Sequence, residues 1–108
     1  MMEQPRIKLP KQARKGEIIQ VKTLISHRME NGLRKNRDGS VIPRKIINNF
    51  ACEFNGKPVI SCDLDTAIAE NPYFQFAARI EGSGTFRFTW RDDDDNTISA
   101  DENIVVIP

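Results

Sequence analysis

Apolar side chains alternate with polar ones over most of this chain, and a period of two is the pattern of half-buried β-strands. The alternation is clearest in residues 17–26, 73–80 and 85–91, and residues 44–54 show a similar one. The side chains expected to face the core are Ile19, Val21, Thr23, Ile25, Ile46, Phe50, Cys52, Phe54, Phe74, Phe76, Ala78, Ile80, Phe86, Phe88 and Trp90. The sequence therefore predicts strands rather than helices along nearly its whole length.

Turn signals separate these apolar segments. An Asn55-Gly56 pair is the strongest short-range signal for a β-hairpin, so residues 59–62 are expected to return as a strand. At the end of the chain, residues 96–100 and 102–108 are expected to form further strands. Other turns are expected at Lys15-Gly16, Asp38-Gly39, residues 82–84 and the acidic residues 92–96.

Six or seven strands at this spacing in a chain of 108 residues predict an all-β fold, an antiparallel β-sandwich. Residues 63–72 are the one segment expected to hold a short helix, ended by Pro72. The length and the lack of an internal repeat indicate a single domain over residues 1–108.

The net charge of +1 conceals an asymmetry between the two halves of the chain. Residues 1–54 hold twelve Lys and Arg against five Asp and Glu, whereas residues 55–108 hold four against ten. A basic and an acidic pole would result, unless strands from both halves interleave and average the charge. No apolar run approaches the roughly 20 residues of a membrane span. The N-terminal residues show no secretory signal, which alone would indicate the cytoplasm.

Residues able to carry chemistry are few, and none forms a recognised catalytic pattern. His27 has no Ser or Cys beside it, so an interface or structural role is expected. Cys52 and Cys62 are expected to be small core residues; a tight turn at 55–56 would not place them opposite each other, whereas a longer loop would allow a disulfide. The run Asp92–Asp95 is expected to be a wet, self-repelling turn, with adventitious Ca²⁺ as the lesser alternative. No catalytic residue, metal or cofactor is expected.

A basic loop, residues 33–45, carries five cations around Asp38-Gly39. Residues 28–45 contain no aromatic side chain for base stacking, and the pI of about 7.8 is not that of a nucleic-acid-binding protein. A small-anion site is an alternative, but flexible cations without a glycine-rich nest bind anions weakly. A surface that docks an acidic protein fits the loop best.

Residues 26–59, taken as one string, resemble the SoxZ family, the small subunit of the SoxYZ sulfur carrier of bacterial thiosulfate oxidation. The matches extend downstream through residues 67–76 and 84–94 and so span nearly the whole chain. Arg28 stands where proline is usual, and the acidic turn is one or two aspartates longer than the family pattern. The matching residues in the first string are His27, Met29, Glu30, Gly32–Lys35, Ile42–Asn48 and Asn55–Lys57.

The resemblance implies an immunoglobulin-like antiparallel β-sandwich and a heterodimer with SoxY, whose arm cysteine carries the sulfur intermediates. This chain ends "ENIVVIP" without a Gly-rich cysteine motif, so a non-catalytic subunit is expected, with transient contacts to other Sox enzymes. The family also implies a periplasmic location, reached by export together with SoxY, in place of the cytoplasm. The residues expected to dock partners are His27, Arg34, Lys35, Arg44 and Lys45.

The sequence leaves two alternative functions open. One is a small enzyme that uses His27 with Cys52 or with Asp92–Asp95. The other is a stand-alone immunoglobulin-like module that binds an acidic protein or a small anion. Neither nucleic acid nor membrane is an expected partner, and self-association of the isolated chain stays open.

Overall fold

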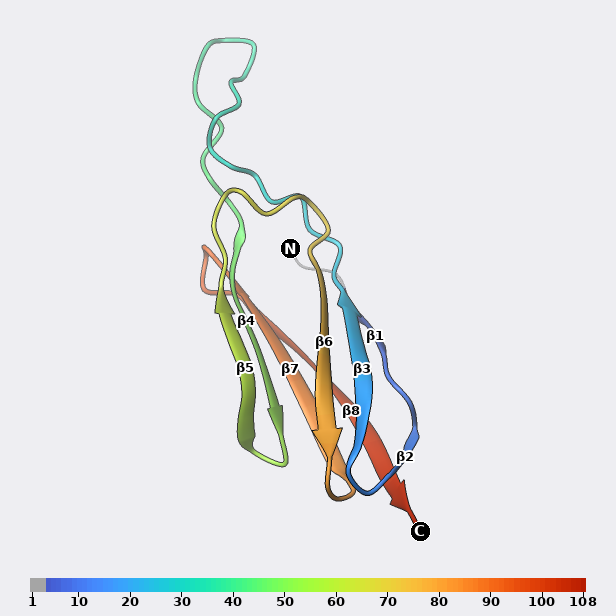
Figure 1. Ribbon diagram of the computed structural model, residues 1–108. Coiled ribbons are helices and arrows are strands. Elements are labelled where there is room, and N and C mark those ends of the chain that lie inside the picture. Colours follow the sequence, from blue (N-terminus) through green and yellow to red (C-terminus); the bar gives the residue numbers. More distant parts are fainter. Residues whose placement is uncertain (1–3) are drawn as a thin grey trace.

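The computed structural model describes residues 4–108, and its strands form two sheets packed face to face (Figure 1). The smaller sheet has the order β1-β3-β6, and the larger has the order β2-β8-β7-β4-β5. The strands are β1 (Arg6–Lys8), β2 (Gln12–Arg14), β3 (Glu17–Leu24), β4 (Ile47–Phe54), β5 (Lys57–Asp63), β6 (Tyr73–Ile80), β7 (Gly84–Asp92) and β8 (Thr97–Ile107). All pairings are antiparallel except the parallel pair β2–β8.

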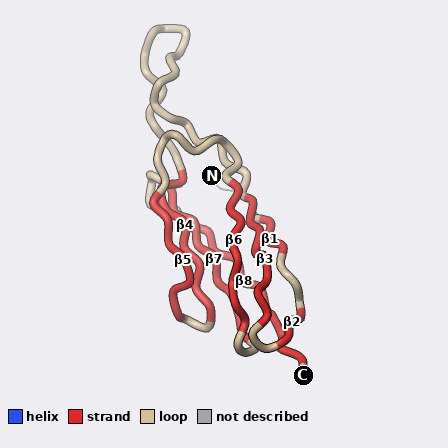
Figure 2. The backbone as a smooth tube through the Cα atoms, in the orientation of Figure 1, coloured by secondary structure: helices blue, strands red, loops and turns tan. Residues whose placement is uncertain are grey.

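The all-β, immunoglobulin-like sandwich expected from the sequence is confirmed. The short helix expected over residues 63–72 is wrong, because no helix occurs anywhere in residues 4–108. That segment instead carries the chain from β5 in one sheet to β6 in the other, as a loop (Figure 2). The two closing strands expected at 96–100 and 102–108 are one continuous strand, β8. β1 and β2 were not anticipated, since each has only three residues and no alternation to detect.

The core lies between the sheets and consists of the alternating side chains. Val21, Phe50, Phe88 and Trp90 are fully buried. The Phe50 ring stacks on Phe74 at a centroid distance of 4.5 Å and packs against Trp90 at 5.2 Å. This contact joins β4 and β7 of the larger sheet to β6 of the smaller one, so aromatic packing holds the two layers together.

The β4–β5 hairpin turns at Asn55-Gly56, as predicted, with positive φ at both residues. A bulge after Cys52 then shifts the register by one residue. Cys52 therefore pairs with Ile60, and Cys62 pairs with Phe50. Both cysteines are free thiols.

The molecule is elongated, with principal extents of 64 × 20 × 19 Å. Much of the length comes from residues 28–45, which leave the end of the sandwich as a long hairpin (Figure 1). We call this hairpin the arm. The described part of the chain contains no helix long and apolar enough to cross a membrane.

Candidate protein-docking site

The arm is a two-stranded ribbon with little pairing. At its base, Glu30 and Lys45 exchange both backbone hydrogen bonds, at N···O distances of 2.9 and 2.8 Å. Farther out, the Ile42 N–H donates to the Arg34 carbonyl at 2.8 Å, and a turn over residues 36–40 closes the tip. Every side chain in residues 33–41 is exposed, so no core stabilises the outer part of the arm.

Two residues of left-handed backbone conformation shape the base of the arm. Met29 has φ of 55°, and its side chain is 6% exposed within the core, where Sδ accepts the Ile47 N–H at 3.3 Å. Gly32 has φ of 83°, and a Cβ there would lie 3.2 Å from the Arg44 Cβ. A side chain at this position would force the two sides of the arm apart.

His27 lies at the foot of the arm and is held by three hydrogen bonds. Its N–H donates to Asn71 Oδ1 at 3.0 Å, and its carbonyl accepts the Asn71 N–H at 2.7 Å. The imidazole Nδ1 accepts the Met29 N–H at 2.9 Å, which leaves the ring proton on Nε2. Burial lowers the pKa of His27, so the ring is neutral at physiological pH. These contacts are those of an anchoring residue at the junction of the arm and the 64–72 loop.

Three of the five cations of the basic loop are paired with carboxylates of the chain itself. Arg44 binds Asp93 through two hydrogen bonds, at 2.9 and 3.0 Å. Lys45 Nζ lies 2.8 Å from Asp94 Oδ2. The third pair, Arg34 with Glu30, has Nε 3.0 and 3.1 Å from the two carboxylate oxygens.

The acidic turn between β7 and β8 therefore supports the base of the arm. Asp93 also accepts the Ile46 N–H at 3.1 Å, and the Arg44 hydrogen bond is the main reason that its pKa falls to about 2. The buried Asp92 side chain accepts the N–H groups of Asp94 and Asn96 at 2.9 Å each. The turn expected at 92–96 is present, but its first three carboxylates have partners instead of repelling one another in water. The basic loop and the acidic turn lie at the same end of the molecule, so these two clusters do not form opposite poles.

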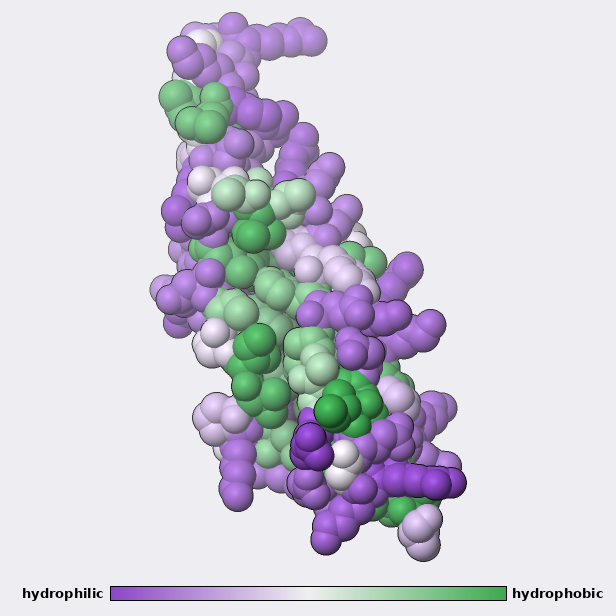
Figure 3. Space-filling model, in the orientation of Figure 1, coloured by the Kyte–Doolittle hydropathy of each residue, from purple (hydrophilic) through white to green (hydrophobic). Residues whose placement is uncertain are grey.

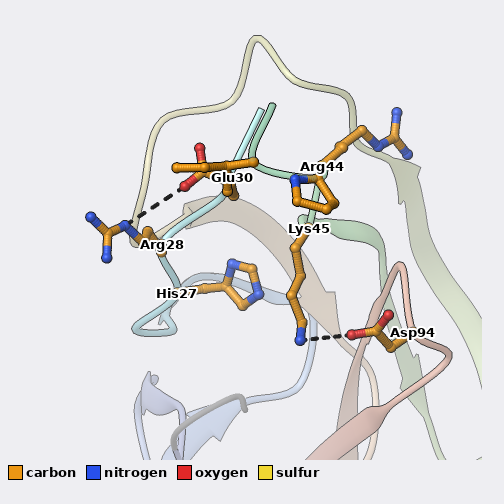
Figure 4. Close-up of a pocket in the computed structure, with 8 residues that line it drawn as sticks. His27, Arg28, Glu30, Arg44, Lys45 and Asp94 are labelled. Carbon is orange, nitrogen blue, oxygen red and sulfur yellow. Dashed lines mark ion pairs between the residues drawn. The ribbon is translucent and has the colours of Figure 1, made fainter. Parts of the chain in front are cut away.

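A cavity of about 500 Å³ lies at the base of the arm (Figure 4). It brings together His27, Arg44 and Lys45, three of the residues expected to dock partners. Arg34 and Lys35, the other two, lie farther along the arm and outside this cavity. Ile42 and Pro43 add an apolar side, and Arg28, Glu30 and Asp94 complete the lining.

The outer arm combines unpaired cations with exposed apolar side chains. Within residues 4–108, Lys35 and Arg37 form no salt bridge, whereas Leu33 is 81% exposed and Val41 is 54% exposed. The sequence placed the docking surface on residues 33–35 and 42–45, so Val41 was missed as a contact residue. The sequence did hold a signal: Leu33 and Val41 stand on either side of a polar segment, residues 34–40, that cannot bury them.

The enzyme alternative paired His27 with Cys52 or with Asp92–Asp95, and neither His27 nor Cys52 is activated in the structure. Cys52 is buried in β4, and burial raises the pKa of its thiol to about 12, so it stays protonated. His27 uses Nδ1 to accept a backbone N–H rather than to activate a nucleophile. Among the described residues, no three His, Cys, Asp or Glu side chains form a group suited to a metal ion.

Solved structures confirm the sandwich architecture. A superoxide reductase (neelaredoxin) from Ignicoccus hospitalis matches with a TM-score of 0.76 at 15% identity, covering 98% of this chain and 82% of that one. A putative superoxide reductase from Thermotoga maritima matches with a TM-score of 0.69 at 14% identity, covering 96% and 86%. The sulfur carrier protein SoxY from Chlorobium limicola f thiosulfatophilum matches with a TM-score of 0.68 at 16% identity, covering 96% and 79%. At such identities the likeness shows the fold alone.

The family assignment comes from the sequence. A comparison with curated proteins returned no match. The model of the family described as "Sulphur oxidation protein SoxZ" matches residues 7–103, which include most of β1, the arm and most of β8. The chain belongs to the SoxZ family of sulfur-oxidation proteins.

Proposed function

We propose that this chain is the non-catalytic partner of a SoxY subunit in a SoxYZ sulfur carrier. The family match over residues 7–103 is the observation that carries the proposal. The buried Cys52, with its pKa raised to about 12, suits a subunit that leaves the sulfur chemistry to its partner. In this proposal the heterodimer is exported as one unit and works in the periplasm.

The arm suits a second part of the role, docking the carrier to the Sox enzymes that act on the bound sulfur. Its base is held by the Arg44–Asp93 and Lys45–Asp94 pairs, so it projects in a defined direction. Its outer part offers Lys35 and Arg37 together with the exposed Leu33. Cations around an apolar contact favour fast, oriented association with an acidic surface.

Co-expression tests the heterodimer directly. The chain would be produced together with a SoxY whose sulfur-carrying cysteine is intact, with an affinity tag on one subunit only. We expect the two to co-purify in equal amounts, and the isolated chain to show no thiosulfate-dependent turnover. Turnover by the isolated chain, or failure to bind SoxY, would overturn the proposal and favour the enzyme or the stand-alone module.

Charge reversal on the outer arm tests the docking role. We expect Lys35→Glu with Arg37→Glu to weaken binding to a Sox enzyme by about tenfold or more at low salt, and by less at high salt. Arg34 and Arg44 are poorer positions for this test, since glutamate there would break the pairs with Glu30 and Asp93.

A matched control places the same change of charge on the sandwich, as Lys8→Glu with Lys22→Glu. These two residues lie opposite each other on β1 and β3, away from the arm. Equal losses of binding in the two double variants would show that only net charge matters, and the arm would then have no docking role.

A further inference from the structure

One side of the sandwich is open. The smaller sheet ends at β6, whereas the larger sheet continues past it to β5 (Figure 1). An apolar band is therefore exposed between β6 and β5, running along the sandwich (Figure 3). Its residues are only partly buried against the core, and none is charged: Phe54, Ile60, Leu64, Phe74, Phe76 and Ala78.

The sheet edges differ in how well they are protected against pairing with another chain. The edges at β1 and β2 are three residues long, and β1 carries Arg6 and Lys8. The β5 edge begins with Lys57 and Pro58 and is bent by the bulge after Cys52. Short length, cations, proline and bulges are the features by which proteins block unwanted strand addition.

The β6 edge is neither short nor bulged and contains no proline. All eight of its residues pair with β3 in one unbroken register, and Arg79 is its single charged residue. Among the described strands, β6 pairs with β3 alone, so its other edge offers unpaired backbone groups. A long, regular edge with a single charged residue, beside an exposed apolar band, is the arrangement that an added strand requires.

The hydrogen bonds at the two ends of β6 show which residues face outward. The Ile25 N–H donates to the Pro72 carbonyl at 3.3 Å, and the Gly16 N–H donates to the Ile80 carbonyl at 2.6 Å. Even-numbered residues of the strand thus direct their backbone groups toward β3. The backbone groups of Gln75, Ala77 and Arg79 point to the open side, because direction alternates along a strand.

We propose that β6 is the heterodimer edge, to which an edge strand of the partner's folded β-domain adds, with its apolar side chains covering the band. The inference rests on the proposed function, whose partner is the cysteine-bearing carrier subunit. A lone strand along eight residues spans about 27 Å and would cover roughly 300–400 Å², well short of the roughly 800 Å² per partner of a stable interface. A folded domain, rather than a free peptide, is therefore the occupant.

Amide hydrogen exchange, measured residue by residue by NMR on the isolated chain and on the co-purified complex, tests this edge. We expect the N–H groups of Gln75, Ala77 and Arg79 to exchange fast in the isolated chain and at least about tenfold more slowly in the complex. Phe74, Phe76 and Ala78 should be protected in both states, as the internal control.

The outcomes separate this inference from the function on which it rests. If the complex forms but the three outward amides still exchange fast, the edge is wrong and the heterodimer stands. If no complex forms, the proposed edge and the proposed heterodimer are both overturned. If the amides are already protected in a dimeric isolated chain, the occupant is a second copy, which overturns the proposed partner.

A substitution at Ala77 gives an independent test of binding. Ala77→Pro removes one outward N–H and leaves the hydrogen bonds to β3 in place. We therefore expect the variant to bind the partner subunit at least about tenfold more weakly. Ala77→Ser keeps the N–H and should bind as the natural chain does. A circular-dichroism melt of each variant checks folding, and unchanged binding by folded Ala77→Pro would overturn the inference.

Discussion

Asp93 is the residue that joins the most distant parts of the chain at the arm's base. Its carboxylate accepts hydrogen bonds from Arg44, the Ile46 N–H and the Asn48 side chain, and all three donors lie more than 40 positions away in sequence. Hydrogen bonds to the charged form lower a carboxyl pKa, which explains the value of about 2. Asp93 therefore fixes the direction of the arm as well as contributing to stability.

We expect Asp93→Asn to change how stability depends on pH. The pKa of Asp93 is depressed in the folded state, so its contribution is present above the unfolded value of about 3.9 and is lost as pH falls toward about 2. The free energy of unfolding, measured in urea from pH 2 to 6, should differ most between natural chain and variant above pH 5, and least near pH 2. Asp101→Asn, in the exposed pair with Arg87, is the control. If the free energy of unfolding of Asp93→Asn differed from that of the natural chain by the same amount at every pH, the lowered pKa of Asp93 would be contradicted.

At the scale of elements, the turn of the β4–β5 hairpin is held by the start of β7. The Asn55 side-chain oxygen accepts the Thr85 N–H at 2.9 Å, and the Asn55 N–H donates to the Thr85 carbonyl at 3.0 Å. Gly84 lies directly beneath, where a Cβ would collide with the Asn55 side chain. The hairpin turn can dock here because residue 84 has no side chain.

We expect Gly84→Ala to destabilise the protein by about 1–3 kcal/mol, because the Asn55 side chain must leave its hydrogen bond to make room. Gly82→Ala is the matched control, since nothing lies within 4 Å of a Cβ at that position. Chemical denaturation of both variants measures the difference. Equal stabilities would show that the hairpin turn moves freely.

At the scale of the whole molecule, the arm makes the protein far from spherical. The Cα radius of gyration is 16.5 Å, whereas a compact domain of this length has about 13 Å. No side chain in residues 33–41 is buried, so the outer arm adds nothing to the core of the sandwich. Such a protruding segment fits the proposed docking role better than a role in stability.

Replacement of residues 34–41 with Asn-Gly should preserve the fold and shorten the molecule. Small-angle X-ray scattering should give a radius of gyration clearly above 13 Å for the natural chain, and a smaller one for the shortened variant. The thermal unfolding midpoint of the variant should stay close to that of the natural chain. A natural chain already near 13 Å would mean that the arm folds back on the sandwich in solution.

Much of the sandwich can be predicted from local pattern. Strand alternation placed Val21, Phe50, Phe88 and Trp90 inside, and Asn55-Gly56 placed the hairpin turn, because both signals depend on near neighbours in sequence. The 63–72 helix was wrong because the loop there must cross between sheets and hold His27 through Asn71. The bulge after Cys52 gives no sequence signal either.

The sequence by itself determined the β-class, the hairpin turns at 55–56 and 92–96, and the family. Only the tertiary structure decided which cations are available, because Arg44 and Lys45 meet Asp93 and Asp94 across nearly half the chain. It also decided that the β6 edge and an apolar band lie open together. Charge and alternation are properties of neighbouring residues, whereas pairing and exposure depend on which distant segments the fold brings into contact.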